Sequence, residues 1–138
     1  MGAGASGLID TDRDFVIKQG IALYIDKDYI TACHLLIPQI EHAICNLALK
    51  LGTQALRMQP SGNEYMVQLM DKLFDVTEIH DFIGDDNIFY LRTLLTEQRG
   101  LNLRNLLCHG LINPIYYDAT KADRIIHALL LIGELKNI

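Results

Sequence analysis

The stretch YITACHLLIPQIEHAICNLALKL, residues 29–51, predicts the longest helix of the chain and decides its fold class. Its apolar residues recur at steps of three and four, which is the period of a helix with one buried face. They are Leu35, Leu36, Ile40, Ala43, Ile44, Leu47, Ala48 and Leu51. Gly52 then supplies a C-terminal stop. Pro38 lies inside the pattern, so we expect either a kink there or a break into two helices.

The helical period continues along most of the chain, in segments separated by polar or turn residues. The expected helices cover residues 12–25, 29–51, 66–74, 88–100, 101–109 and 119–135. Thr11 or Asp12 is the expected N-cap of the first helix. Residues 80–87 are an expected loop, in which Asp86 or Asn87 caps the helix that follows. The sequence therefore predicts an all-α helical bundle.

Length and composition favour one domain. The chain has 138 residues, of which 50% are hydrophobic and 21% charged, and this suffices for one sizeable core. We expect residues 1–10 to be a leader that is flexible or was added to the natural chain. Residues 11–138 are then one helical domain with one irregular internal loop at 52–64. No apolar run approaches the roughly eighteen residues of a membrane-spanning helix, so we expect no membrane contact.

Charge and cysteine content limit the function classes. The net charge is −5, whereas a domain that coats nucleic acid is normally basic, so contact with a phosphate backbone must be local or shared with a second subunit. The chain has three cysteines, Cys33, Cys45 and Cys108. A disulfide framework and a zinc site are not expected, because the number of these cysteines is odd and none of them are in C-x-x-C spacing. We interpret them as core residues of a cytoplasmic protein. We expect neither a metal nor a cofactor, because no tight group of potential ligands occurs.

A second stretch, RGLNLRNLLCHGL at residues 99–111, places a cation, an amide and an imidazole among leucines. Asn105 and His109 are four residues apart and share one side of a helix. Arg104 and His109 are five apart and point about 140° away from each other on an ideal helix. Gly110 lets the helix end at His109, and the long Arg104 side chain can turn toward the same cavity. The spacing thus allows one constellation of three side chains.

These three side chains suit the cleavage of a phosphodiester in RNA. An imidazole moves protons near neutral pH, and a guanidinium binds two phosphate oxygens at once. His109 would accept the proton of the 2′-hydroxyl, and Arg104 would stabilise charge that develops on the phosphate. Asn105 would orient the imidazole or contact the substrate. The products would be a 2′,3′-cyclic phosphate and a 5′-hydroxyl, without need of a metal.

The segment RNLLCHG resembles the R-x(4–6)-H motif of the HEPN superfamily, whose members often have a polar residue after the arginine. The wider run GLNLRNLLCHGL, with LLIPQIEHAI upstream, is similar to the C-terminal helical domain of a HEPN-related family of unknown function. The resemblance covers most of residues 28–135. It implies a HEPN-like bundle that often forms homodimers, with the two motif helices meeting so that paired arginines and histidines line a cleft.

The resemblance also implies activities and partners. Many active members of the superfamily are metal-independent endoribonucleases of toxin–antitoxin, phage-defence or RNA-processing systems, and others are non-catalytic binding modules. Carried onto this chain, Arg104, Asn105 and His109 are the expected catalytic residues. RNA is the expected substrate, and an antitoxin or another protein is an expected partner.

Four further residues are candidates for substrate binding. Arg92 and Arg99, on the preceding helix, are the nearest additional cations. Glu41 could add a carboxylate from the long helix, or it could belong to a solvated polar side. Tyr116, in the turn after the motif, could stack on a base, or it could pack the loop.

The sequence leaves three functions open. The leading one is a metal-independent endoribonuclease. The second is a non-catalytic helical module that binds a partner protein or a nucleotide. The third is the C-terminal domain of a longer protein whose catalysis resides elsewhere.

Overall fold

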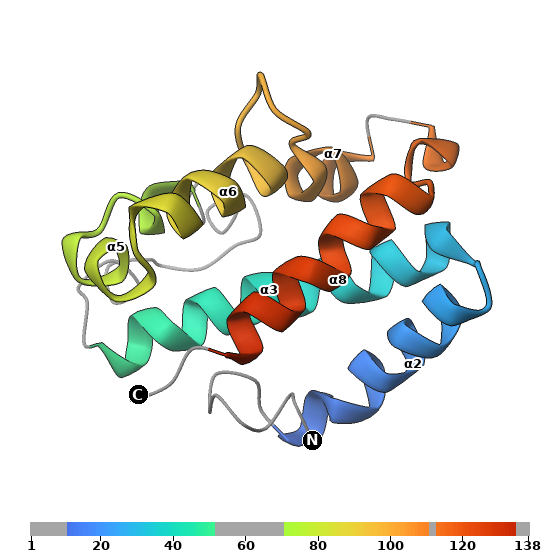
Figure 1. The fold of residues 1–138 in the computed structure, drawn as a ribbon, viewed down its shortest axis with the longest axis horizontal. Helices are drawn as coiled ribbons and strands as arrows, with labels where there is room; N and C mark the ends of the chain where they lie inside the picture. The colour runs from blue at the N-terminus through green and yellow to red at the C-terminus, as the bar shows by residue number, and fades with distance from the viewer. Residues whose placement is uncertain (1–10, 52–70, 111–112, 135–138) are drawn as a thin grey trace.

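The protein is a bundle of helices in three groups. The computed structural model describes residues 11–51, 71–110 and 113–134, and within these ranges the regular elements are helical and no strand occurs, which confirms the all-α prediction. Helices α3 (Tyr29–Lys50) and α8 (Ala119–Gly133) cross at the centre (Figure 1). Helix α2 (Asp14–Ile25) packs along α3 on one side. The other side carries α5 (Thr77–Ile83), α6 (Asp85–Leu95) and α7 (Leu103–His109).

Helix α3 forms because its cap and its apolar period agree. The Asp28 side chain accepts a hydrogen bond from the Thr31 N–H and so caps the helix. Pro38 lies inside one uninterrupted helix, so the alternative of a break into two helices is wrong. Six of the eight apolar residues of the predicted face are buried, and Leu35 and Leu51 are partly buried. The buried residues of α3 are Ala32, Cys33, Leu36, Ile37, Gln39, Ile40, Ala43, Ile44, Leu47 and Ala48.

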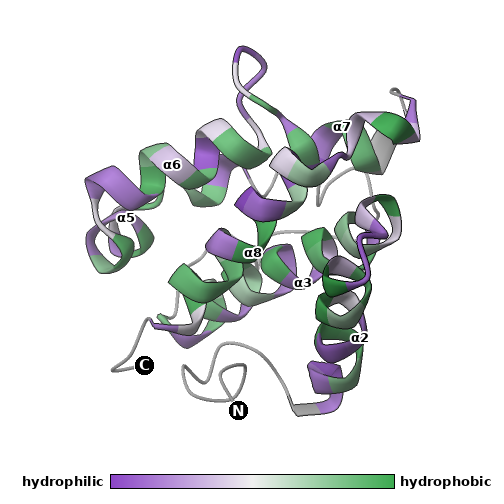
Figure 2. Ribbon diagram, turned by 45° about the vertical axis from the view of Figure 1, so that its right-hand side comes forward, coloured by the Kyte–Doolittle hydropathy of each residue, from purple (hydrophilic) through white to green (hydrophobic). Residues whose placement is uncertain are grey.

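Helix α8 completes the core against α3. Asp118 caps its N-terminus, because the Asp118 side chain accepts a hydrogen bond from the Lys121 N–H. The helix buries Ala122, Ile125, Ala128, Leu129 and Ile132. Figure 2 shows that hydrophobic residues occur on every labelled helix, α2 included. On α2, however, Phe15 and Ile25 are each 69% exposed, so only one side of that helix belongs to the core.

Three local predictions are wrong. The helix expected at 88–100 ends at Leu95, so Arg99 lies in the turn after α6 and not on that helix. A 3-10 helix, η1 (Thr11–Arg13), precedes α2, whose N-cap is Arg13 without a side-chain hydrogen bond, so neither Thr11 nor Asp12 caps it. Residues 80–87 are not a loop, because α5 and α6 meet there at the single residue Gly84. Gly84 has φ 97° and ψ 149°, a conformation that glycine alone adopts readily, so the chain turns without a longer connection.

Several expectations fall outside the described residues. They are the leader at 1–10, the irregular loop at 52–64 and most of the helix expected at 66–74. The post-motif turn is described from Asn113 and contains a second 3-10 helix, η2 (Pro114–Tyr116). None of the described helices combines the length and the hydropathy needed to cross a membrane.

Candidate functional site

Helix α7 carries the RNLLCHG segment and is placed by the turn before it. Gly100 packs so tightly that an added Cβ would lie 2.2 Å from the Thr93 carbonyl oxygen, which also accepts a hydrogen bond of 3.0 Å from the Leu101 N–H. Asn102 caps α7 in the left-handed conformation. At the other end, Gly110 is left-handed with φ 62°, so α7 ends at His109 as its sequence predicts.

Arg104, in the first turn of α7, forms a two-point ion pair with Glu41 of α3. Its Nε donates to Glu41 Oε1 at 2.9 Å, and its Nη2 donates to Glu41 Oε2 at 2.6 Å. The Arg104 side chain is 3% exposed and that of Glu41 is 15% exposed. The structure thus brings together two candidate residues that are 63 positions apart in the sequence.

Asn105 extends this pair into a network that reaches α6. Its Oδ1 accepts a hydrogen bond of 3.4 Å from Arg104 Nη1, and its Nδ2 donates to the Thr96 carbonyl oxygen at 3.3 Å. The Thr96 hydroxyl in turn donates to Asp71 at 3.0 Å. Glu41, Arg104, Asn105 and the Thr96 carbonyl, here called the Glu41–Arg104 network, therefore tie the start of α7 to α3 and to the end of α6.

The geometry changes the role that Arg104 can have. Its guanidinium is shielded from solvent and makes two of its bonds to a carboxylate. A phosphate from solvent could bind the guanidinium only after Glu41 moved or after the helices parted. In a single chain Arg104 joins α7 to α3, and removing either partner of this buried ion pair would leave a costly unpaired charge.

The relation of this network to His109 is given by the helix backbone. The side chains of Cys108 and His109 lie outside the described residues. The backbone of α7 places His109 in its last turn, one helical turn beyond Asn105 and on the same side. The side-chain bonds of Asn105 described above run to Arg104 and Thr96. The network thus fixes the helix on which His109 stands.

The remaining candidates are dispersed around this network. The Arg92 guanidinium binds the Asp75 carboxylate at 2.7 Å, and its carbon lies 5.7 Å from the centre of the Phe74 ring. Arg92 thus holds α6 to the turn that precedes α5. Tyr116 is partly buried against the core, and the Lys121 ammonium covers one face of its ring at 4.3 Å. Arg99 is exposed. The structure therefore does not gather these three residues around Arg104.

Cysteine chemistry and metal binding find no support in the described residues. Burial raises the pKa of the Cys33 thiol to about 12 and that of the Cys45 thiol to about 11, so both stay protonated and unreactive at neutral pH. In the described part of the chain no group of three or more histidine, cysteine, aspartate or glutamate side chains is arranged to bind a metal ion.

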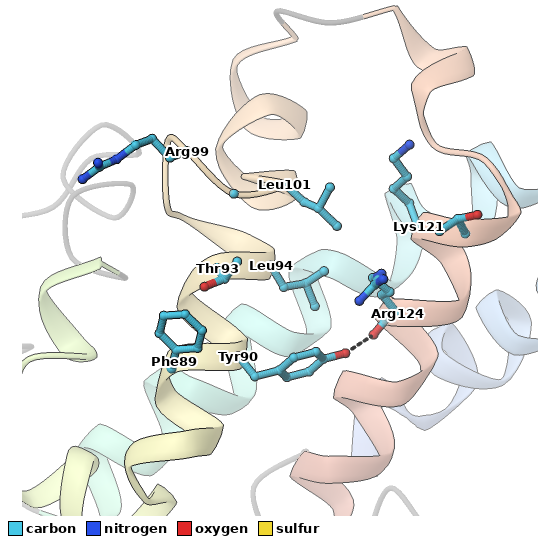
Figure 3. A pocket seen from close by; sticks show the side chains of 10 residues that line it. Phe89, Tyr90, Thr93, Leu94, Arg99, Leu101, Lys121 and Arg124 are labelled. Atoms are coloured by element: carbon cyan, nitrogen blue, oxygen red, sulfur yellow. Dashed lines mark hydrogen bonds between the residues drawn. The ribbon is translucent and has the colours of Figure 1, made fainter.

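The sequence reasoning missed a pocket of about 510 Å³ between α6 and α8 (Figure 3). Its lining combines apolar side chains of α6 with cations of α8, among them Lys121 and Arg124. The only trace of it in the sequence is this pair of cations three residues apart in an acidic chain. That spacing is common on helix surfaces, and only the packing of α6 on α8 makes it a site.

Comparisons with protein-family models, with curated proteins and with solved structures find no match to this chain.

Proposed function

We propose that this chain is a HEPN-like, metal-independent endoribonuclease domain. In the proposed reaction the RNA 2′-oxygen attacks the adjacent phosphorus and forms a new P–O bond, while His109 accepts the 2′ proton. The bond from phosphorus to the 5′-oxygen breaks, and that oxygen takes a proton from a water molecule. The hydroxide that remains takes the proton from the His109 imidazolium, which restores the neutral base. The products are a 2′,3′-cyclic phosphate and a 5′-hydroxyl.

The single observation that supports this proposal is the Glu41–Arg104 network at the start of the helix that ends at His109. A buried ion pair often contributes no more to stability than apolar residues of the same size would. We therefore attribute the ion pair between Glu41 and Arg104 to the need to hold α7 in one position, and not to a gain in stability. A catalytic imidazole requires such a fixed support.

The homodimer belongs to the same proposal. With Arg104 buried in its own chain, the charge on the phosphate would be stabilised at a cleft between two α7 helices, where a second subunit brings its own polar groups. An enzyme of this kind would act in the cytoplasm, in a toxin–antitoxin or phage-defence setting in which an antitoxin or another protein neutralises it.

The test is cleavage of a labelled RNA with EDTA present. The expected result is a cyclic-phosphate product from the wild-type chain and a loss of about 100-fold or more in His109→Ala, because general-base catalysis contributes on this scale. His80→Ala is the matched control. His80 lies on α5, and Figure 1 shows α6 between α5 and α7, so His80 is far from the motif helix. Equal cleavage by wild type and His109→Ala, or no cyclic phosphate, overturns the enzyme proposal.

The positioning role of Arg104 has its own readout. Arg104→Lys keeps the charge but cannot make the two-point bond to Glu41. Because the guanidinium does not contact bound RNA in this role, we expect kcat to fall while KM changes by less than about twofold. A large rise in KM with unchanged kcat would instead assign a direct phosphate contact to Arg104.

A second candidate function is a non-catalytic binding module. The observation that favours it is the 3% exposure of the Arg104 side chain, since a phosphate-binding group must be reachable. Under this alternative the network serves α7 as a docking element, and the RNA assay gives no product from any variant.

A further inference from the structure

The pocket between α6 and α8 combines positive charge with apolar side chains. Among the described residues that line it are three cations, Arg99, Lys121 and Arg124, and no carboxylate. The chain as a whole has a net charge of −5. A local group of cations in an acidic chain points to an anionic ligand. The chain as a whole repels anions, whereas the positive potential of this pocket attracts them.

The cations differ in availability. Arg124 is exposed, and Figure 3 shows its side chain reaching from α8 toward Leu94 and Tyr90. Lys121 is partly engaged, since its Nζ lies 3.5 Å from Asp118 Oδ2 and covers the Tyr116 ring. Arg99 extends away from α8 in Figure 3 and stands at the rim. Figure 3 shows the Lys121 side chain extending away from Arg124, so Arg124 is the group that meets an anion inside the pocket.

The opposite wall is apolar and aromatic. It consists of Phe89, Tyr90 and Leu94 from α6, together with Leu101 from the turn before α7. The Tyr90 hydroxyl donates to the Arg124 carbonyl oxygen at 3.3 Å, which holds the two helices together across the floor. Phe89 is 73% exposed, an unusual state for so large a ring, and is available for stacking. A planar ring therefore fits opposite the cations.

We propose that this pocket binds one nucleotide unit, with its phosphate on Arg124 and its base against Phe89. A volume of about 510 Å³ suits a ligand of this size. The hydroxyls of the lining are those of Thr93, Thr120 and Tyr90, and that of Tyr90 is already bonded to the Arg124 carbonyl oxygen. The pocket therefore offers little to read a base edge, and it accepts all four bases. The nucleotide comes either free or as part of an RNA chain. The proposal does not require that the protein cleaves RNA.

The test is isothermal titration of the full chain with two probes. One is AMP, and the other is a short 2′-O-methyl oligoribonucleotide, which cannot be cleaved by its own 2′-oxygen. Arg124→Glu reverses the charge at an exposed position, and Phe89→Ala removes the exposed ring, so neither change is expected to unfold the protein. Lys18→Glu is the matched control, because Lys18 is an exposed cation on α2.

We expect binding that weakens at least about tenfold in Arg124→Glu and severalfold in Phe89→Ala, while Lys18→Glu stays within about twofold of wild type. Binding of AMP assigns the pocket to free nucleotides, and binding of the oligonucleotide alone assigns it to RNA. Absence of binding by both probes, or affinities that Arg124→Glu leaves unchanged, overturns the proposal. His109→Ala separates this result from the proposed cleavage, since it should lose activity and keep nucleotide binding.

Discussion

At the scale of single residues, breaking the contact between Arg104 and Glu41 is predicted to destabilise the protein as much as an ordinary core deletion does. Glu41→Gln leaves the Arg104 charge buried at 3% exposure beside a neutral amide. We expect the free energy of unfolding to fall by about 3 kcal/mol or more, which urea denaturation measures. Replacing both residues by methionine removes both charges, and we expect the double variant to recover much of this loss.

The matching single variants are Glu41→Met and Arg104→Met. A double variant whose loss in the free energy of unfolding exceeds the sum of the two single losses would contradict this account. Such a result would show that each side chain has independent partners. Ile44→Ala is a reference for an ordinary core loss of about 2–5 kcal/mol, because Ile44 is fully buried on the same helix.

The buried thiols predict how stability depends on alkaline pH. The pKa values of Cys33 and Cys45, about 12 and 11, exceed the ordinary thiol value of 9.0 because burial disfavours the thiolate. The unfolded chain therefore loses protons first. The stabilisation is fully present below pH 9 and decreases as the pH rises toward 11 and 12.

This decrease is measured as the free energy of unfolding between pH 8 and pH 10.5. We expect the Cys33→Ala, Cys45→Ala double variant to be less stable at pH 8 and to lose less stability than wild type over the range. Equal slopes for the two proteins would contradict the burial effect. The raised pKa of Tyr90 acts in the same direction in both proteins and so cancels in the comparison.

At the scale of secondary-structure elements, the position of α7 depends on a glycine that has no room for a side chain. In Gly100→Ala the new methyl group would meet the Thr93 backbone, so the turn has to shift. We expect a loss of about 1–3 kcal/mol in thermal or urea unfolding. Gly110→Asn is the control, because its site is open and asparagine tolerates the left-handed conformation. Equal losses in both variants would contradict the steric explanation.

The elements also show what the sequence could predict. The extent of α3 and the end of α7 at His109 follow from local signals, an apolar period in one case and Gly110 in the other. The error at 80–87 arose because a glycine followed by aspartates is typical of a loop. Here Asp85 and Asp86 occupy the first turn of α6, where carboxylates interact favourably with the helix dipole.

The candidate site was predictable only in part, because its contacts cross the fold. RNLLCHG singles out Arg104 and Asn105 by residue type, but the partner of Arg104 stands on another helix. Nothing local distinguishes Glu41 from a solvated carboxylate until α7 is packed on α3. The same holds for the pocket, whose rings come from α6 and whose cations come from α8 and from the turn after α6.

At the scale of the whole molecule, the proposed homodimer predicts a mass. We expect light scattering of the purified chain to give twice the 15.6 kDa of one chain. Leu106 is a partly exposed leucine of α7, whereas its neighbour Leu107 packs against the core. We expect Leu106→Glu to yield a monomer, because a charge at an apolar interface is costly.

Leu130→Glu on α8 is the matched control. Leu130 is 62% exposed and belongs to the C-terminal end of α8, which lies away from α7 in Figure 1. It should remain dimeric. A wild-type chain that is monomeric at the concentrations of the cleavage assay would remove the shared cleft from the proposed mechanism.

The ion pair between Arg104 and Glu41 also has a consequence for descent. A mutation that changes one of the two residues strands a charge in the interior, so it is harmful until a second mutation follows at a codon 63 positions away. Lineages that diverged from a common ancestor should therefore keep both residues or have exchanged both, and intermediates with only one should be scarce. An alignment rich in such intermediates would mean that natural selection does not treat the two positions as one unit.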